Sequence, residues 1–228
     1  MNKMESIYQK QAELYDELVS HEDYNNNLFN LINTKIDLLN KTVCEFGVGT
    51  GRVTKTYIDK IKSADLFDRS IHMLEQTKIN LKDQLDKITV NELDNKNIEQ
   101  ISKYYDISIE GWSFGHLISE NSDNVAYWSN KLINDLKRIS NRIIIIETLG
   151  TNIDEPYPPN ISLATFYKTL KENGFKEYII NTDYKFDSTD QAQYILGSFF
   201  GDKMKEDIRQ KKLAIIKEFT GIWIFELE

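Results

Sequence analysis

TVCEFGVGTGR, residues 42–52, is the stretch of this sequence that decides the fold. A short apolar run ends in an acid, and three glycines on alternate positions follow it: Gly47, Gly49 and Gly51. Apolar residues with helical spacing continue over residues 53–61. This order predicts a strand at Thr42–Phe46, a tight turn and a helix. Glycine permits positive φ and lets a ligand approach the backbone closely, and the N-terminal amides of the following helix would point at that ligand.

The spacing of the glycines indicates which ligand the turn suits. A dinucleotide fingerprint has the form G-x-G-x-x-G, with the pyrophosphate on the helix N-terminus. Here the third glycine comes one residue early, and Arg52 stands where that pattern wants glycine or alanine. Glu45 lies two residues before the first glycine, at the expected mouth of the site. A carboxylate there suits a ligand with an ammonium group better than one with a pyrophosphate. An ordinary glycine turn without a ligand is the alternative.

A second acid follows the next predicted strand. Residues 63–67 have a strand pattern, and Asp68 comes directly after them. An acid about 20 residues past the glycine turn is placed to hold both ribose hydroxyls of a nucleoside ligand. An acid at a helix N-terminus, favoured by the helix dipole, is the alternative role for Asp68, and the two roles are compatible. Asp65 falls inside the strand and is the weaker candidate.

Two motifs resemble those of class I S-adenosylmethionine (SAM)-dependent methyltransferases. The glycine turn reads E-F-G-x-G-T-G-R, and residues 68–74 read D-x-S-x-x-M-L. The resemblance implies that Asp68 binds the ribose and that Met73 packs near the adenine. It also implies a polar contact to the adenine after the third strand, for which Glu92 is the first candidate and Asp94 the second.

The resemblance extends over nearly the whole chain, to a group of bacterial small-molecule methyltransferases. Three of the segments that carry it are Gly111-Trp112-Ser113, Glu147-Thr148-Leu149-Gly150-Thr151 and Thr220-Gly221-Ile222-Trp223. It implies SAM as the cofactor. The residues expected to bind the cofactor are Glu45, Gly47, Gly49, Gly51, Arg52, Asp68, Arg69, Met73, Glu92, Glu110 and Trp112.

Strands alternate with helices along the chain, which predicts a parallel sheet with its ligand site at the carboxyl ends of the strands. Strand patterns occupy residues 42–46, 63–67, 88–90, 104–110, 142–147, 178–182 and 221–227. Helix patterns occupy residues 4–19, 28–39, 53–61, 71–85, 125–139, 163–172, 191–200 and 203–217. The expected fold class is α/β, with a Rossmann-like, mostly parallel sheet and helices on both faces; the number of seven strands follows from the resemblance. A single methyltransferase domain is expected over residues 1–228, with an N-terminal helical arm at 1–40 and the α/β core at 41–228.

The N-terminal arm is expected to act as a lid. It precedes the first strand and is free to cross the carboxyl edge of the sheet, so residues 4–24 are expected to close over the bound cofactor. Tyr8, Tyr15 and Tyr24 in this arm are large amphipathic groups that can face a ligand and still form hydrogen bonds. An arm that only covers a hydrophobic face is the alternative.

Two residues are predicted to be catalytic. His116 follows the fourth strand, and a histidine can take a proton from a nucleophile near neutral pH. A histidine at a helix start that bonds only to backbone is the alternative. Tyr15 is the second predicted catalytic residue, and Trp112 and Tyr184 are further candidates for the acceptor side of the site.

The composition restricts the partners. The chain has a formal net charge of −8 and no basic cluster, whereas a domain that grips nucleic acid usually has a basic face, so no nucleic acid is expected. Cys44 is the single cysteine, which excludes an internal disulfide and a cysteine metal cluster and fits a cytoplasmic protein. No metal is expected. No apolar run approaches the ~18 residues of a membrane span. A monomer or homodimer is expected.

The function that these observations favour is methyl transfer from SAM to a small-molecule acceptor. Methyl transfer is an in-line displacement at a sulfonium carbon with a good leaving group, so the protein mainly positions the two reactants. This explains why no conspicuous catalytic cluster stands out. A non-catalytic module that binds SAM or a partner is one alternative. A nicotinamide-dependent oxidoreductase is another, and the glycine spacing speaks against it.

Overall fold

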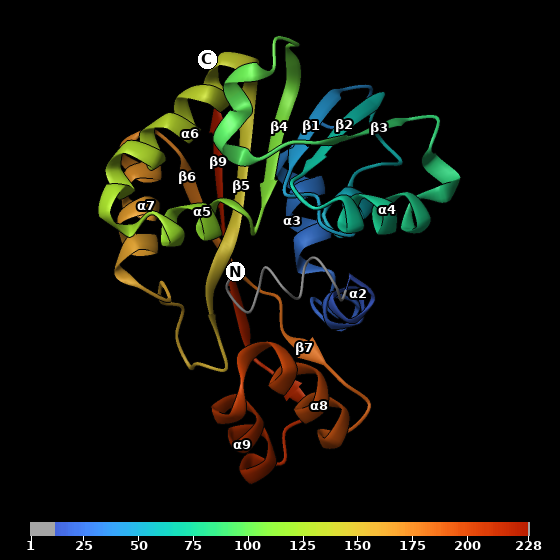
Figure 1. Ribbon diagram of the computed structural model, residues 1–228, viewed down its shortest axis with the longest axis vertical. Helices are drawn as coiled ribbons and strands as arrows, with labels where there is room; N and C mark the ends of the chain where they lie inside the picture. The colour runs from blue at the N-terminus through green and yellow to red at the C-terminus, as the bar shows by residue number, and fades with distance from the viewer. Residues whose placement is uncertain (1–11, 228) are drawn as a thin grey trace.

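A seven-stranded sheet runs through the centre of the computed structural model, which describes residues 12–227 (Figure 1). The strand order is β3-β2-β1-β4-β5-β9-β6, and β9 is antiparallel to both of its neighbours while the other pairs are parallel. The strands are β1 (Thr42–Phe46), β2 (Ser63–Asp68), β3 (Ile88–Glu92), β4 (Tyr105–Gly111), β5 (Ser140–Thr151), β6 (Lys176–Asn181) and β9 (Glu218–Glu226). The predicted fold class, an α/β fold with a mostly parallel seven-stranded sheet, is confirmed.

Helices cover both faces of this sheet. One face packs against α5 (Phe114–Glu120), α6 (Val125–Ile139) and α7 (Ile161–Glu172). The other face packs against α3 (Asn27–Lys35), α4 (Ile71–Asn80) and the turns of residues 53–61. Residues 12–227 also contain four short 3-10 helices: η1 (Thr54–Thr56), η2 (Lys82–Gln84), η3 (Asn95–Gln100) and η4 (Ser122–Asn124).

Strand β5 shows why an unbroken apolar run forms the middle of the sheet. Ile143 and Ile145 belong to the apolar cluster beneath α6 and α7, and Ile144 and Ile146 belong to the cluster on the opposite face. Successive side chains of a strand point to opposite faces. A run of isoleucines therefore fits a strand that helices cover on both sides.

A small lobe lies beyond the carboxyl edge of the sheet (Figure 1). It consists of α8 (Thr189–Phe200), α9 (Asp202–Lys211) and a two-stranded antiparallel sheet of β7 (Tyr184–Lys185) and β8 (Ile215–Ile216). Its apolar cluster includes Phe199 and Ile208, and it also includes Leu18 of α2 (Ala12–Ser20). The N-terminal arm thus packs on a lobe that is contributed by the C-terminal part of the chain.

Backbone hydrogen bonds fix the arm to the segment that enters the small lobe. The Asp23 N–H donates to the Thr182 carbonyl at 3.2 Å, and the Lys185 N–H donates to the His21 carbonyl at 2.9 Å. The predicted lid over residues 4–24 includes Tyr8, which lies outside the described residues. For the described part, any opening of α2 has to involve the small lobe, because the two share both an apolar cluster and these hydrogen bonds.

Some predicted helices differ from the structure. The predicted helix at 53–61 is wrong, because only η1 and turns are found there. The hydroxyls of Thr54 and Tyr57 donate to the carboxylate of Glu45, so the side chains of this segment turn toward the sheet. The predicted helix at 203–217 ends at Lys211, because Lys212 takes a left-handed conformation with φ 51°. The helix α5 was not predicted.

In the described residues, no helix combines the length and the apolar character needed to cross a membrane.

We expect Trp223→Ala to reduce the free energy of unfolding by about 3–5 kcal/mol, the usual cost of removing a large aromatic side chain from a core. Trp223 is fully buried and stacks on Tyr167 with ring centroids 4.4 Å apart. Urea unfolding followed by circular dichroism measures the loss. Trp223→Phe should cost clearly less, because the indole N–H that it removes has no hydrogen-bond partner in the described structure. A larger loss for Trp223→Phe than for Trp223→Ala would contradict this account of the core.

Candidate functional site

A cavity of about 660 Å³ opens at the carboxyl ends of β1, β2, β3 and β4. Eight of the residues predicted from the sequence line it: Tyr15, Gly47, Gly49, Asp68, Arg69, Met73, Trp112 and His116. Asp94, the second candidate for the adenine contact, also lines it, together with six residues that were not predicted: Ser70, Leu93, Asn95, Gly111, Ser113 and Leu117. Glu45, Gly51, Arg52, Glu92 and Glu110 are not part of the lining.

The glycine turn forms one wall of the cavity and packs directly on the loop after β4. Gly47 has φ 65°, and a Cβ atom at this position would lie 2.1 Å from the Cβ of Ser113. Such a distance is far below any van der Waals contact, so only glycine fits here. The loops after β1 and β4 can therefore meet at the sheet edge and form a continuous wall of backbone and small side chains.

Asp68 ties the end of β2 to the glycine turn. One of its carboxylate oxygens accepts the Gly49 N–H at 2.9 Å, and the other accepts the Ser70 N–H at 2.8 Å. Burial raises the pKa of this carboxyl, and the two backbone hydrogen bonds oppose the rise. A carboxylate offers about four acceptor positions, so Asp68 can still accept hydroxyl groups from a ligand in the cavity.

Glu45 lies beneath the turns of residues 53–57 and outside the cavity lining. One carboxylate oxygen accepts the Thr54 hydroxyl at 2.7 Å and the Tyr57 hydroxyl, and its other oxygen has no partner among residues 12–227. Burial raises the pKa of Glu45 to about 7. The structure thus places this acid under the turn rather than at the mouth of the site, and its contact with a cofactor stays a prediction.

The sequence favoured Glu92 over Asp94 as the contact to the adenine, but only Asp94 lines the cavity. Glu92 is the last residue of β3 and lies outside the lining, whereas Asp94, the second candidate, lines the cavity next to Leu93. The Asp94 carboxylate caps η3 by accepting the Lys96 N–H at 2.9 Å. The pattern of alternating faces could not have found this, because residues 92 and 94 share one face only if the strand continues, and here it ends at residue 92.

His116 is part of α5, and charged residues of α5 and of the segment after β2 act on it. The charged groups that act on it are Glu120, one helical turn along α5, and Arg69. Arg69 and Glu120 form an ion pair at 3.5 Å. Burial lowers the pKa of His116, so the imidazole is neutral near pH 7. A neutral imidazole can accept a proton or a hydrogen bond from a ligand.

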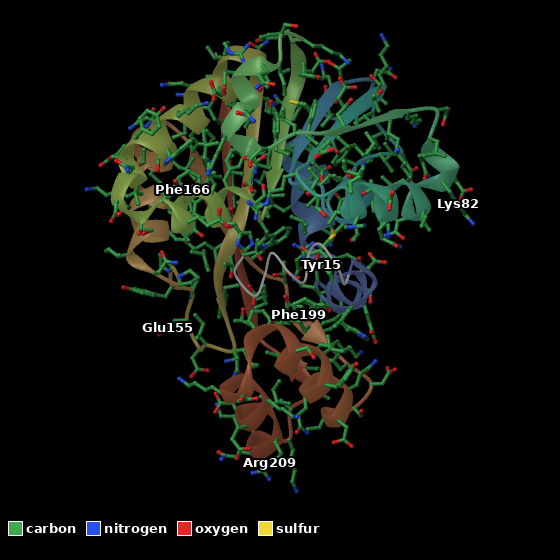
Figure 2. All side chains as sticks on the ribbon, in the orientation of Figure 1. Tyr15, Lys82, Glu155, Phe166, Phe199 and Arg209 are labelled. Atoms are coloured by element: carbon green, nitrogen blue, oxygen red, sulfur yellow. The ribbon has the colours of Figure 1, made fainter. Side chains whose placement is uncertain are left out.

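Tyr15 brings the N-terminal arm over the glycine turn. A Cβ atom at Gly49 would lie 3.6 Å from Cε1 of Tyr15, so the ring rests on the turn itself. Figure 2 shows Tyr15 and Phe199 at the junction between the sheet and the small lobe, and their rings meet edge-on with centroids 6.3 Å apart. Burial raises the pKa of Tyr15, which keeps its hydroxyl protonated at neutral pH.

Two buried acids at the ends of β4 and β5 hold the loop that forms the cavity wall. Glu110 accepts the backbone N–H groups of Ser113 at 2.6 Å and Phe114 at 2.9 Å, and Glu147 accepts the N–H of Gly115. The two carboxyl groups lie close enough for each to affect the pKa of the other. Burial raises the pKa of Glu110 to about 7, and burial together with the Glu110 charge raises that of Glu147 further. Glu110 thus supports the wall from behind.

Trp112 has an unusual backbone conformation between these acids and the cavity. Its φ is 50°, which is uncommon for a bulky residue and is found mainly where function demands it. The Trp112 N–H donates to the Ile146 carbonyl at 2.8 Å, which fixes the backbone. The guanidinium of Arg52 lies over the indole ring, 3.5 Å from its centroid, and forms a buried ion pair with Glu22.

The cavity therefore offers three kinds of contact. Backbone and small side chains at Gly47 and Gly49 allow a close approach, Asp68 and Asp94 supply carboxylate acceptors, and the side chains of Met73, Leu93 and Leu117 supply apolar surface. A mostly apolar cavity with a few convergent polar groups is the usual form of a small-molecule or cofactor site. The arrangement suits a ligand with a flat apolar part, adjacent hydroxyl groups and a polar end at the glycine turn.

Comparisons with known proteins give a consistent assignment. No protein-family model matches the chain. A curated protein from Anoxybacillus flavithermus, named "Uncharacterized methyltransferase", is 25% identical over 174 residues, which cover 74% of this chain and 75% of that protein.

Solved structures with the same fold include proteins that are named as methyltransferases of different kinds. The YcgJ protein from Bacillus subtilis has a TM-score of 0.60 with 12% identity, covering 90% of this chain and 100% of that one. A "putative RNA methyltransferase" from Pyrococcus horikoshii has a TM-score of 0.56 with 15% identity, covering 89% and 83%. A precorrin-6y C5,15-methyltransferase from Geobacter metallireducens has a TM-score of 0.52 with 12% identity, covering 86% and 87%. The chain has the fold of class I SAM-dependent methyltransferases, and the resemblance found in its sequence is confirmed.

The raised pKa values of Glu110 and Glu147 predict how stability changes with pH. Both acids hold protons in the folded protein above the pKa near 4.5 that they have when unfolded. The folded state therefore binds more protons than the unfolded state, and the free energy of unfolding should fall as the pH rises from about 4.5 to about 7. Glu147→Gln keeps the hydrogen bonds without the ionisation, so its stability should fall less over this range. Urea unfolding at several pH values measures the slopes.

Glu155→Gln is the matched control for this experiment. Glu155 is exposed in the loop after β5 (Figure 2), and this variant should keep the wild-type slope. Equal slopes for wild type and Glu147→Gln would show that the two acids do not retain protons in the folded state.

Proposed function

We propose that this protein, which has the fold of class I SAM-dependent methyltransferases, transfers a methyl group from SAM to a small-molecule acceptor. The observation that carries the proposal is the link between Asp68 and Gly49 at the edge of the cavity. This hydrogen bond holds the carboxylate of Asp68, which can accept ribose hydroxyls, next to a stretch of backbone without a Cβ atom. A ligand with a nucleoside part and a charged amino-acid part fits both at once.

The residues of the cavity fit SAM in a definite order. Asp68 would accept the ribose hydroxyls with its remaining lone pairs. Met73, Leu93 and Leu117 would enclose the adenine, and Asp94 would accept from its amino group. The methionine part would then extend along the turn at Gly47 and Gly49, where no Cβ atom obstructs it. Tyr15 would cover it from the arm.

The residues of this chain have three tasks in the reaction. Bound SAM supplies an electrophilic methyl group on a sulfonium. The wall at Gly111 and Trp112 and the ring of Tyr15 would hold the acceptor in line with that group and exclude water, which is the main contribution that such a displacement needs. His116 is neutral near pH 7 and could take a proton from the acceptor. Tyr15 keeps its proton, so it would orient the acceptor as a hydrogen-bond donor.

Three observations support a small acceptor and the absence of a nucleic-acid substrate. The formal net charge is −8. The described part of the arm crosses the glycine turn, which narrows access to the cavity. The chain has a single cysteine, and it is buried in β1, so its thiol takes no part in the chemistry. A cytoplasmic location belongs to the same proposal.

We expect the protein to bind S-adenosylhomocysteine, and to bind it more tightly than the oxidised nicotinamide dinucleotide, because the glycine spacing suits an amino-acid end rather than a pyrophosphate. Asp68→Ala should weaken the binding of S-adenosylhomocysteine by about 1.5–3 kcal/mol, the usual value for hydrogen bonds to a charged group. Asp68→Asn keeps one acceptor oxygen and should lose less. Isothermal titration calorimetry measures all three. Tighter binding of the dinucleotide, or an unchanged dissociation constant in a folded Asp68→Ala variant, would contradict the proposal.

Gly49→Val should abolish the binding of S-adenosylhomocysteine in a protein that still folds. The φ of Gly49 is 57°, a value that a β-branched residue strongly resists, and the added side chain would occupy the approach to the backbone. Gly174→Val is the control, because Gly174 has φ 89° but follows α7, remote from the cavity. Calorimetry and circular dichroism on both variants separate strain from loss of the site. Native affinity in Gly49→Val would show that the turn does not hold the cofactor.

A further inference from the structure

We propose that the methyl acceptor carries an oxyanion, a carboxylate or a phosphate, which Arg52 and Lys55 hold in a second cavity beside the cofactor cavity. The inference rests on the proposed function, because it assigns the acceptor side of the same site. It starts from a cavity of about 620 Å³ that shares Trp112 with the cofactor cavity.

The second cavity lies where three parts of the chain meet. The loop before α3 contributes Glu22, Asp23 and Asn26, the turns after the glycine motif contribute Arg52, Lys55 and Thr56, and the end of β6 contributes Thr182. Figure 1 shows α3 between the sheet and α2, so the cavity is near the junction of the core and the arm. Leu28, Phe29 and Trp112 give it an apolar side.

Both acids of this cavity already have partners within the protein. Glu22 forms a buried ion pair with Arg52 and a hydrogen bond with the Tyr184 hydroxyl. The two oxygens of Asp23 accept the N–H groups of Asn27 at 2.8 Å and Leu28 at 2.9 Å, which caps α3. Glu22 is thus engaged as an ion-pair partner and Asp23 as a helix cap.

Both cations of this cavity keep free donors. In the part of the chain that the structure describes, only Nη1 of Arg52 has a hydrogen-bond partner, and a guanidinium carries five N–H donors. The side-chain ammonium of Lys55 forms no ion pair or hydrogen bond with any of residues 12–227. A planar guanidinium and a nearby ammonium bind carboxylate and phosphate groups well. The unused hydrogen-bonding capacity of the cavity therefore suits an anion.

Trp112 connects this anion site to the methyl-transfer site. Its ring lines both cavities, and the Arg52 guanidinium lies against the ring face. The left-handed backbone at Trp112 and its hydrogen bond to Ile146 keep the ring in this shared position. An acceptor anchored at Arg52 and Lys55 thus extends along Trp112 toward the cofactor. The apolar side of the cavity suits an aromatic or aliphatic body between the anion and the nucleophile.

The test uses fluorinated probes and the full-length protein saturated with S-adenosylhomocysteine. Fluorine NMR would follow the binding of 4-fluorobenzoate, 4-fluorophenylacetate and 4-fluorophenyl phosphate, with 4-fluorobenzyl alcohol as the neutral probe. At least one anionic probe should bind, and the alcohol should bind more weakly. Lys55→Gln should weaken the anion about five- to ten-fold, as expected for the loss of one charge-assisted hydrogen bond at a site open to water. The probe that binds most tightly shows whether the oxyanion of the acceptor is a carboxylate or a phosphate.

Lys82→Gln is the matched control. It removes the same charge from η2, on the far side of α4 (Figure 2), and should leave the binding of every probe unchanged. Absence of binding by all three anions, or equal weakening in Lys55→Gln and Lys82→Gln, would overturn the inference. Calorimetry with S-adenosylhomocysteine on the same samples separates this failure from a failure of the proposed function. If the cofactor product binds and the anions do not, only the anion site is wrong.

Discussion

The close approach of Gly47 to Ser113 is the constraint on which the site depends. It brings the loop after β1 against the loop after β4 with no space for a Cβ atom at residue 47. Ser113 is held in that position by Glu110, which accepts both its N–H and its hydroxyl. Glu110 in turn interacts electrostatically with Glu147 on the neighbouring strand. The wall of the cavity is thus supported by a chain of contacts that reaches through three adjacent strands of the sheet.

A buried pair of acids is a costly support unless both are hydrogen-bonded. Here three backbone N–H groups of the loop and of α5 donate to the pair, and the raised pKa values of both acids favour their uncharged forms. A carboxylate has a similar role at the junction with the small lobe, where Glu22 interacts with Arg52 of the core and with Tyr184 of β7. In both places a carboxylate links segments that are distant in sequence. The acids that surround the site therefore act mainly on the protein itself, and Asp68 and Asp94 are the ones that face the cavity.

The sequence allowed the sheet and half of the cavity to be predicted, because these depend on local patterns. Alternating apolar runs located all seven strands, and the glycine turn with Asp68 located the edge at which the cavity opens. The helix at 53–61 could not be excluded from periodicity alone, since the hydrogen bonds of Thr54 and Tyr57 to Glu45 are tertiary contacts. The roles of Arg52 and Asp94 were also hidden, because the first depends on the stacking with Trp112 and the second on where β3 ends. The two-residue strands β7 and β8 are too short to give any alternating signal.

The docking of α2 on the small lobe has a consequence for how the chain folds during synthesis. The apolar partners of Leu18 lie at residues 184–216, so they leave the ribosome long after the arm itself. Domains form as their segments emerge, and contacts between distant segments have to wait for the loop between them to close. The sheet can assemble β1 to β5 while the arm is still uncommitted and the glycine turn is uncovered. Tyr15 can settle over that turn only after the lobe has formed, so the cover of the cavity matures later than the turn that it covers.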